Sequence, residues 1–420
     1  MTVVIAGAGI GGLTLALSLH QVGIDCVVYE SVDEIKPLGV GINVLPHAVR
    51  ELTELGLQQR LSQTAIETAE LVYFSKHGKL IWSEPRGKRA GYNWPQFSIH
   101  RGQLQMLLLA ATQERLGHDA VRMGYHLKDW EQSGSKLTVT FTDRAGTVIK
   151  DTVASDCLIA ADGIHSVARA KLYPDEGPPA WDGAILWRGV TVAKPLLTGA
   201  TMAMVGHEFQ KFVTYPISTE TDDPETSLIN WIAELKFEQN YNWHREDWNR
   251  GGNLADFLPA FENWRFDWLD IPELVRNAEH VFEYPMVDRD PLQRWTHGAM
   301  TLLGDAAHPM YPIGSNGASQ AILDARTLTR EFQKHGVNEA ALAAYEDERR
   351  PATAKIVAGN RAGGPDEVLD VIENRAPEGF DDINAIAPLK ERKEIADRYK
   401  ALAGFDKDTL NDRPSIVATA

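Results

Sequence analysis

Three short segments that lie far apart in the chain hold residues whose types and spacing could do chemistry. Glycines allow a backbone to approach a phosphate closely, and carboxylates accept hydrogen bonds from ribose hydroxyls. The segments are Gly7-Ala8-Gly9-Ile10-Gly11-Gly12, Asp162-Gly163-Ile164-His165-Ser166 with Arg169, and Gly304-Asp305-Ala306-Ala307-His308 continuing to Pro312, Gly314 and Gly317. Together they predict a site for one nucleotide-containing cofactor.

The first segment has the pattern of a phosphate-binding turn between a strand and a helix. The apolar run of residues 2–6 is typical of a buried parallel strand, and an apolar helix begins near Leu13. In such a turn Gly7 would bend the chain, Gly9 would admit a pyrophosphate and Gly12 would let helix and strand pack closely. The helix would present free N–H groups and the positive end of its dipole to the pyrophosphate.

An acidic residue follows at the spacing that a dinucleotide site requires. A second apolar strand, residues 25–29, ends at Glu30, about 20 residues beyond the glycines, where an acceptor for ribose hydroxyls is expected. Glycine-rich turns also serve ordinary packing, so the glycines alone are weak evidence. Strand, glycines, helix, strand and acid in register predict a dinucleotide site.

Other parts of the chain indicate the elements that position these segments. Residues 156–161 and 300–303 are apolar runs that predict buried strands, and each leads directly into one of the later segments. Alternation of apolar and polar residues over 201–205, 211–217 and 227–235 predicts an antiparallel sheet with one covered face.

We therefore expect an α/β fold, in which a Rossmann-like cofactor-binding domain carries an inserted antiparallel-sheet domain that faces the substrate. The cofactor-binding domain is predicted to be discontinuous. It comprises residues 1–73, 98–180 and 283–362, the substrate domain comprises 74–97 and 181–282, and 363–420 form a charged, helical C-terminal tail.

Composition excludes several other classes of protein. The 420-residue chain has a net charge of -16, which argues against nucleic acid or an anionic membrane as its partner. Cys26 and Cys157 lie in apolar runs and are interpreted as buried free thiols of a reducing compartment. The apolar N-terminus lacks the basic leader of a signal peptide. We expect a cytoplasmic monomer or homodimer, with no membrane association and no metal site.

The three motifs, in this order and at these separations, resemble the single-component FAD-dependent aromatic hydroxylases, the family of p-hydroxybenzoate and salicylate hydroxylases. Local strings such as Pro37 to Asn43, Trp187-Arg188-Gly189-Val190 and Gly314 to Gln320 are similar to phenazine-modifying monooxygenases of that family. The similarity covers about residues 1–361. It implies a p-hydroxybenzoate hydroxylase-like fold with FAD as cofactor and NADH or NADPH as co-substrate.

The resemblance also implies a reaction. NADH or NADPH would reduce FAD, and the reduced flavin would react with O2 to form a C4a-hydroperoxide. One oxygen would then pass to an electron-rich aromatic or heteroaromatic small molecule, and the other would leave as water. If the substrate carries a ring carboxylate, hydroxylation could occur with decarboxylation, and Arg188 is the candidate partner of that carboxylate.

What the resemblance implies about single residues can be stated in this numbering. The ADP half of FAD would be held by Gly7, Gly9, Gly12 and Glu30, while Gly41, Arg101 and Asp305 would lie near the pyrophosphate, ribityl chain or ring. Asp162 and Arg169 would serve both FAD and the approach of the nicotinamide. Pro312 would lie beside the flavin ring, and Gly314, Gly317 and Ala318 would direct N–H groups at the ring edge that becomes anionic on reduction.

The substrate pocket is predicted from strand alternation. It would be lined by Met202, Met204, Phe212, Tyr215, Trp231 and Ile313, with Tyr215 and Pro312 as the candidate catalytic residues. Each assignment has a structural alternative. Asp162-Gly163 is also a common turn, His308 could be a packed residue behind the cofactor, and Arg169 and Arg188 could be salt-bridged.

Two other functions share the FAD motifs. A flavin-dependent NAD(P)H reductase or dehydrogenase would consume nicotinamide without inserting oxygen. A non-enzymatic, redox-sensing flavoprotein would not be reduced rapidly by nicotinamide in the presence of an aromatic compound.

Overall fold

The computed structural model describes residues 2–238 and 250–418. A five-stranded sheet in the order β20-β12-β1-β2-β8 forms one half of the molecule, and each neighbouring pair is parallel. Its strands are β1 (Thr2–Ala6), β2 (Asp25–Glu30), β8 (Val121–Met123), β12 (Cys157–Ala160) and β20 (Met300–Leu302). The predicted Rossmann-like sheet is therefore confirmed. Its strands come from segments far apart in the sequence, and they are continuous apolar runs because both faces of a parallel sheet are covered.

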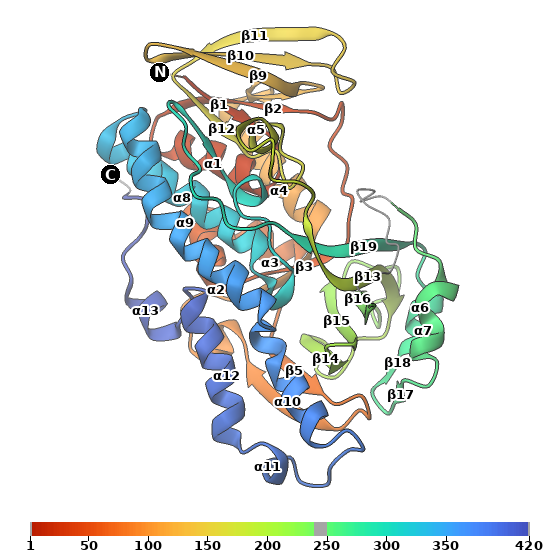
Figure 1. The fold of residues 1–420 in the computed structure, drawn as a ribbon. Helices are drawn as coiled ribbons and strands as arrows, with labels where there is room; N and C mark the ends of the chain where they lie inside the picture. The colour runs from red at the N-terminus through yellow and green to blue at the C-terminus, as the bar shows by residue number, and fades with distance from the viewer. Residues whose placement is uncertain (1, 239–249, 419–420) are drawn as a thin grey trace.

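Helices cover one face of this sheet and a small antiparallel sheet covers the other (Figure 1). The covering helices are α1 (Ile10–Gln21), α4 (Arg101–Leu116), α8 (Gly317–His335) and α9 (Glu339–Arg361), and the small sheet consists of β9 (His126–Ser133), β10 (Lys136–Thr142) and β11 (Ile149–Ser155). Gly336, with φ +78°, ends α8, and the side chain of Asn338 accepts the first free N–H groups of α9. The two long helices can therefore pack side by side.

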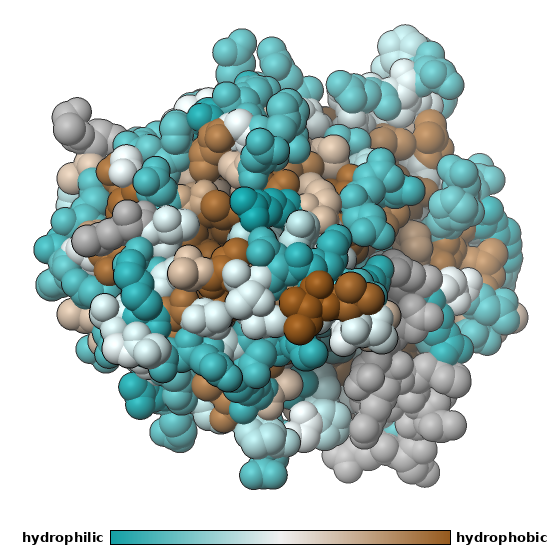
Figure 2. Space-filling view, turned by 90° about the horizontal axis from the view of Figure 1, so that it is seen from above, coloured by the Kyte–Doolittle hydropathy of each residue, from teal (hydrophilic) through white to brown (hydrophobic). Residues whose placement is uncertain are grey.

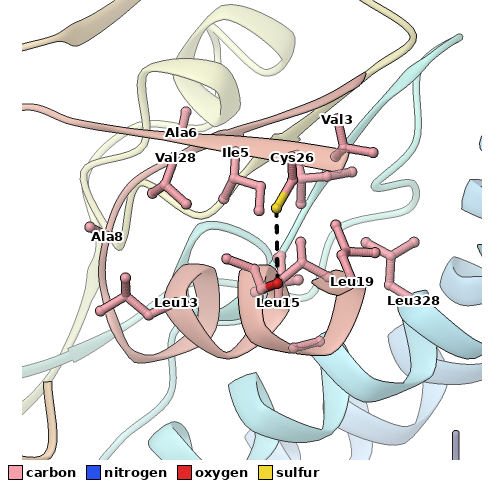
Figure 3. Close-up of a cluster of buried hydrophobic side chains, with 14 of the residues drawn as sticks. Val3, Ile5, Ala6, Ala8, Leu13, Leu15, Leu19, Cys26, Val28 and Leu328 are labelled. Carbon is pink, nitrogen blue, oxygen red and sulfur yellow. Dashed lines mark hydrogen bonds between the residues drawn. The ribbon is translucent and has the colours of Figure 1, made fainter. Parts of the chain in front are cut away.

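Figure 3 shows how β1, β2 and α1 bury their apolar residues against each other. Val3, Ile5 and Val28 from the strands face Leu15 and other leucines of α1. The thiol of Cys26 donates to the carbonyl of Ala16 at 3.9 Å, and burial raises its pKa to about 12. This core fixes the glycine turn between β1 and α1.

A seven-stranded sheet, in the order β19-β13-β16-β15-β14-β5-β6, forms the second half. Its strands are β5 (Glu70–Phe74), β6 (Leu80–Pro85), β13 (Ala180–Ala193), β14 (Thr201–His207), β15 (Gln210–Ser218), β16 (Ser227–Lys236) and β19 (Val281–Asp288). The predicted sheet is present, but it is mixed, because β14 and β5 pair in parallel. Strands β5 and β19 also belong to it, whereas the predicted boundaries at residues 73 and 283 cut through both. Residues 239–249 of the predicted substrate domain lie outside the described residues.

The two faces of the seven-stranded sheet are covered by different elements. One face packs against α6 (Leu254–Phe261) and α7 (Ile271–Arg276), and the opposite face packs against α10 (Glu367–Arg375) and α12 (Leu389–Leu402). Figure 1 shows α12 and α10 beside β5 at the end of the molecule far from the parallel sheet. The C-terminal tail is helical, as predicted, but it is an integral part of the fold.

The remaining elements are smaller. They are β3 (Gly41–Val44), β4 (Ile66–Glu67) and β7 (Phe97–His100), which form one sheet, the pair β17 (Arg265–Phe266) and β18 (Leu269–Asp270), and the helices α2 (Pro46–Glu54), α3 (Gln58–Thr64), α5 (Val167–Leu172), α11 (Ile383–Ile386) and α13 (Lys407–Asp412). The face shown in Figure 2 is mostly hydrophilic with apolar groups interspersed. Among the described residues, no helix has the length and apolar composition needed to cross a membrane.

Candidate functional site

The glycine turn after β1 has the geometry of a pyrophosphate cradle. A side chain at Gly7, whose φ is +108°, would overlap the carbonyl of Ala161, and a side chain at Gly12 would overlap the carbonyl of Gly7. A Cβ at Gly9, by contrast, would have no atom within 4 Å. Gly9 therefore borders open space at the start of α1, where no side chain caps the free N–H groups.

Glu30 lies beside this turn, as its spacing predicts. Its carboxylate accepts hydrogen bonds from the N–H groups of Ala8, at 2.8 Å, and Val32, at 3.0 Å. These bonds hold the acid at the carboxyl end of β2, next to the open space at Gly9. The cradle and the acid together fit the ADP half of FAD.

A second helix N-terminus lies near the first, since a Cβ at Gly11 in α1 would lie 3.3 Å from Ala321 in α8. Helix α8 begins at Gly317, where a Cβ would meet nothing within 4 Å, and no side chain caps its first N–H groups. Asp305 follows β20 and is exposed although Gly304 and Ala306 on either side are buried. An exposed carboxylate beside free N–H groups fits the ribityl chain and ring edge of a flavin.

His308 is hydrogen-bonded to a carboxylate that also holds the turn after β20. Its side chain is buried, and Nε2 lies 2.5 Å from the carboxylate of Asp324, which also accepts the N–H of Gly304 at 3.0 Å. Burial would raise the pKa of Asp324, but His308 and Arg349 lower it to about 2. The interpretation of His308 as a packed, hydrogen-bonded residue is confirmed.

Asp162, in the second motif, accepts hydrogen bonds from the backbone of the helix that follows it. The carboxylate of Asp162 accepts the N–H groups of Val167, at 2.9 Å, and Ala168, at 3.4 Å, and so caps α5, while its buried second oxygen has no partner among the described residues. Burial raises the pKa of Asp162. This unpartnered oxygen leaves Asp162 available to a ligand.

The guanidinium of Arg169, which was predicted to serve the cofactor, is engaged by other parts of the chain. Its buried guanidinium forms an ion pair with Glu176 and donates to the carbonyls of Ala306, Ala307 and Asp290. These bonds use all five N–H groups of an arginine. Arg169 instead ties α5 to the turn that carries Asp305, a role that only the tertiary structure shows.

Gly41, at the start of β3, forms hydrogen bonds with three residues of the seven-stranded sheet. Its carbonyl accepts hydrogen bonds from Arg188, at 2.7 Å, and from the hydroxyl of Tyr215, at 2.9 Å, and its N–H donates to Asn230 at 2.7 Å. The hydroxyl proton of Tyr215 is therefore engaged by the backbone. Tyr215 can position Gly41 and Arg188, and only its oxygen lone pairs remain for a substrate.

Arg188 and Arg101 both lie close enough to Tyr284 for their charges to act on it. Burial raises the pKa of Tyr284, and the nearby charges of Arg188 and Arg101 partly offset this rise. Arg101 starts α4 and is exposed, whereas Nε of Arg188 is buried and has no partner among the described residues. Arg188 therefore keeps a donor for an anionic group.

The loop at residues 312–316 is held by a residue that sequence reasoning missed. The hydroxyl of Tyr399 in α12 lies 2.8 Å from Asn360, 2.9 Å from Asn316 and 3.2 Å from the carbonyl of Ile313. Gly314 has φ +69°, and a side chain there would overlap Tyr399. In the sequence, the four-residue spacing of the apolar residues Ile395 and Tyr399 is a local signal that this helix has a buried face.

The side chains predicted to line one substrate pocket lie on two different faces of the sheet. Met202, Met204 and Tyr215 share the face covered by α10 and α12. Phe212 and Trp231 lie on the opposite face, in the core beneath α6 and α7. Successive strand residues point to opposite faces, so residues 212 and 215 cannot line one pocket.

Two cavities flank the loop at residues 312–316. The first, of about 30 Å³, lies beside Met202, Met204, Gly314, Ser315 and Tyr399 and is called the Met204 cavity. The second, of about 60 Å³, lies beside Lys211, Met286 and Ile313 and is called the Lys211 cavity. In the part of the chain that the structure describes, no group of three His, Cys, Asp or Glu could hold a metal ion.

The fold and the site define a flavoprotein built around a dinucleotide cradle. The model of the FAD binding domain family matches residues 1–235 and 274–360, so the chain belongs to that family. Phenazine 1,6-dicarboxylic acid hydroxylase PhzS of Lysobacter antibioticus is 46% identical over 361 residues, which are 86% of this chain and 89% of that protein. The 3-amino-4-hydroxybenzoate 2-monooxygenase PtmB3 of Streptomyces platensis is 31% identical over 98% of both chains.

A solved structure shows the same fold. HpxO of Klebsiella pneumoniae, complexed with FAD and uric acid, superposes with a TM-score of 0.74 over 99% of this chain and 97% of that one, at 24% identity. The protein is thus an FAD-dependent aromatic monooxygenase that uses NAD(P)H and O2. The named relatives are hydroxylases and monooxygenases, which supports oxygen insertion and not the reductase alternative.

Proposed function

We propose that this enzyme hydroxylates a heteroaromatic carboxylic acid of the phenazine class. The observation that carries the proposal is the 46% identity to a phenazine dicarboxylic acid hydroxylase, which extends over 86% of the chain. The unpartnered Nε of Arg188 supports it, because a buried guanidinium donor suits a carboxylate.

The proposed cofactor site uses the glycine turn after β1, the residues that follow the other strands, and the loop that leads into α8. Gly7, Gly9, Gly12 and Glu30 hold the ADP half of FAD, with Gly41, Arg101, Asp162 and Asp305 toward the centre of the molecule. Pro312, Gly314, Gly317 and Ala318 lie beside the ring. When bound, FAD supplies the redox chemistry that activates O2. The chain's own residues then have to bind and orient the substrate, and they have to exclude water from the site.

The proposed substrate site lies between the loop at residues 312–316 and the seven-stranded sheet. Arg188 pairs with a ring carboxylate, while Tyr215 holds Arg188 and Gly41 in place. Met202 and Met204 provide an apolar surface for a flat ring system. The enzyme is further proposed to act in the cytoplasm as a monomer or homodimer.

The reaction can be written so that atoms balance. A ring hydrogen is replaced by hydroxyl as NAD(P)H, a proton and O2 give NAD(P)+ and water. If hydroxylation occurs at the carbon that bears the carboxylate, CO2 leaves in place of the ring hydrogen and one further proton is taken up. Product analysis distinguishes the two courses, because only the second releases CO2.

The test is oxidation of NADH and of NADPH by the purified, FAD-loaded protein with phenazine, phenazine-1-carboxylate and phenazine-1,6-dicarboxylate, in 18-O2. Urate and 3-hydroxybenzoate serve as comparison substrates. We expect carboxylate-dependent oxidation and one heavy oxygen in a phenazine product, with or without release of CO2. Oxidation that yields only peroxide with every phenazine, or faster turnover of a comparison substrate, would overturn the proposal.

A further inference from the structure

Three side chains of the seven-stranded sheet hold the backbone of one residue, Gly41. Arg188 and Tyr215 donate to its carbonyl at 2.7 and 2.9 Å, and Oδ1 of Asn230 accepts from its N–H at 2.7 Å. A Cβ at Gly41 would lie only 2.7 Å from the Cβ of Asn230, so this close approach requires glycine. The three side chains therefore have defined positions around one residue of β3.

These three side chains lie on the same face of the sheet. Asn230 is paired with Tyr215 in β15 and with Val190 in β13, and Arg188 lies two residues before Val190. Residues directly opposite each other in adjacent strands, and residues two apart in one strand, point to the same face. Val190 packs against the cluster that contains Tyr215, on the face turned away from the aromatic core.

Two nitrogen donors in this group have no partner among the described residues. They are Nε of Arg188 and Nδ2 of Asn230, both shielded from solvent, and Asn230 is 0% exposed as a whole. The orientation of the Asn230 amide is determined, because a backbone N–H can only donate and the amide oxygen must therefore face Gly41. Buried donors are almost always hydrogen-bonded, so these two nitrogens require acceptors from outside the described chain.

The guanidinium of Arg188 has no negative charge beside it that would offset its burial. Burial lowers its pKa, and the other groups that act on it are Tyr215, Tyr284 and Arg101. Burial also raises the pKa of both tyrosines, so neither is an anion at neutral pH. A carboxylate would neutralise Arg188 and accept a hydrogen bond from its Nε.

The sheet surface around Arg188 is apolar and only partly covered. Its half-buried side chains are Val190, Ile232, Phe282 and Tyr284. Strand β19 contributes two of them, whose ring centroids lie 6.2 Å apart at an interplanar angle of 31°. Ile313, in the loop at residues 312–316, packs against the same surface. A surface of this kind suits a flat aromatic ring system, next to the loop that is proposed to lie beside the flavin.

We propose that Asn230 is a specificity-determining residue that recognises a ring nitrogen of the substrate. Nε of Arg188 binds the ring carboxylate, and Nδ2 of Asn230 donates to a heteroaromatic nitrogen on the same edge of the ring system. Because a C–H group cannot accept this hydrogen bond, the enzyme discriminates against carbocyclic acids of the same shape. The inference rests on the proposed function, since it presumes that the substrate is an aromatic carboxylic acid.

The test compares acids of matched shape that differ in whether their rings contain nitrogen. Phenazine-1-carboxylate is paired with anthracene-1-carboxylate, and quinoline-8-carboxylate is paired with naphthalene-1-carboxylate. Dissociation constants are measured by equilibrium dialysis against the oxidised, FAD-loaded enzyme. The amount of FAD that each variant retains is measured as well. The ratio of the two dissociation constants within a pair reports recognition of nitrogen.

The variants separate the donor of Asn230 from its other contacts. Asn230→Leu is the main variant, since it keeps a similar volume and removes the amide. Asn230→Asp keeps an acceptor for the N–H of Gly41 and removes the donor, so it provides a second measurement if Asn230→Leu does not fold. Thr214→Val is the matched control, because Thr214 donates to the carbonyl of Asn230 at 3.0 Å and points to the opposite face of the sheet.

We expect the wild-type enzyme to bind each nitrogen-containing acid about tenfold more tightly than its carbocyclic partner. Asn230→Leu and Asn230→Asp should bind the two members of a pair about equally, and Thr214→Val should keep the ratio of the wild type. Equal binding of both members by the wild type would overturn the inference. An unchanged ratio in Asn230→Leu together with a loss of FAD would also overturn it, since the amide would then serve the cofactor.

The two acid pairs distinguish failure of this inference from failure of the proposed function. Hydroxylation of phenazine-1-carboxylate by an enzyme that binds anthracene-1-carboxylate equally well would refute the role of Asn230 and leave the proposed function standing. Preference for quinoline-8-carboxylate over naphthalene-1-carboxylate, lost in Asn230→Leu and accompanied by no binding of the phenazine acid, would refute the phenazine proposal and support the role of Asn230.

Discussion

The two faces of the seven-stranded sheet come from the same strands but have different compositions. Beneath α6 and α7 the side chains are aromatic and closely stacked, with Trp187 and Phe257 5.0 Å apart and Phe212 and Trp231 6.1 Å apart between ring centroids. The other face carries Lys211, Tyr215 and Arg188, and it borders both cavities. One face is therefore an aromatic core, and the other holds the polar and charged groups.

The difference follows from the alternation of strand residues. The aromatic face depends mainly on volume, because most of its atoms form no hydrogen bonds and the indole N–H of Trp231 is paired with Thr191 at 3.0 Å. The opposite face holds charges out of water, and each needs a partner on another element. Substitutions on the two faces should consequently fail in different ways.

The largest effect is expected at Trp231. Trp231→Ala removes a fully buried indole and should lower the free energy of unfolding by about 3–5 kcal/mol. The folded fraction should retain the relative affinities of the wild type for different aromatic ligands. Urea unfolding and ligand titration measure the two quantities. A Trp231→Ala protein that is as stable as the wild type but prefers different ligands would contradict this assignment of Trp231 to the core.

Removal of the Lys211 ammonium should lower the free energy of unfolding by a similar amount, for a different reason. Its ammonium lies 2.8 Å from Asp366 and 3.2 Å from Glu234, and all three side chains are buried. Lys211→Met leaves two buried carboxylates unpaired, which typically costs about 3–5 kcal/mol. The triple variant with Asp366→Asn and Glu234→Gln should recover most of this loss in urea unfolding, whereas no recovery would show that the charges are not the cause.

Arg188→Gln should change recognition more than stability. We expect the KM for a phenazine carboxylate to rise about tenfold or more, with little change in the binding of unsubstituted phenazine. Steady-state kinetics with the acid and flavin-absorbance titration with both ligands provide the test. An equal effect on both ligands would assign Arg188 to structure alone.

A smaller effect is expected at Tyr399, which reaches the loop from α12. Tyr399→Phe removes the hydroxyl that contacts Asn316, Asn360 and Ile313, for about 1 kcal/mol of net hydrogen bonding. The loop should become less well held, with a few-fold weaker FAD affinity and more peroxide released for each NAD(P)H oxidised. Unchanged flavin fluorescence and unchanged peroxide would show that the loop does not depend on Tyr399.

The smallest effect concerns Asp370 at the edge of the Lys211 cavity. Burial raises its pKa from 3.8 to about 6. Because the folded protein binds this proton more tightly than the unfolded chain, stability from this group is lost as the pH rises from about 4 through about 6. Asp370→Asn should therefore raise the urea midpoint slightly at pH 7 and not at pH 4. A rise of equal size at both pH values would contradict the assignment.

Local patterns made the cofactor half predictable. The glycines, the flanking strands and Glu30 follow one another directly at the start of the chain, and their order alone determines the turn. The error over Phe212 and Trp231 was avoidable, because strand alternation already separates residues 212 and 215. Arg169 and Tyr399 were not predictable, since most of their partners belong to distant parts of the sequence and depend on how whole elements pack.

The parallel sheet has a consequence for synthesis of the chain. Strand β1 leaves the ribosome early, but its second neighbour, β12, begins only at Cys157, and β20 begins only at Met300. Apolar strand edges therefore remain uncovered during most of translation, when they can pair with other chains. The Met204 cavity is completed still later, by α12, so a nascent chain can begin to form the glycine turn well before this cavity exists.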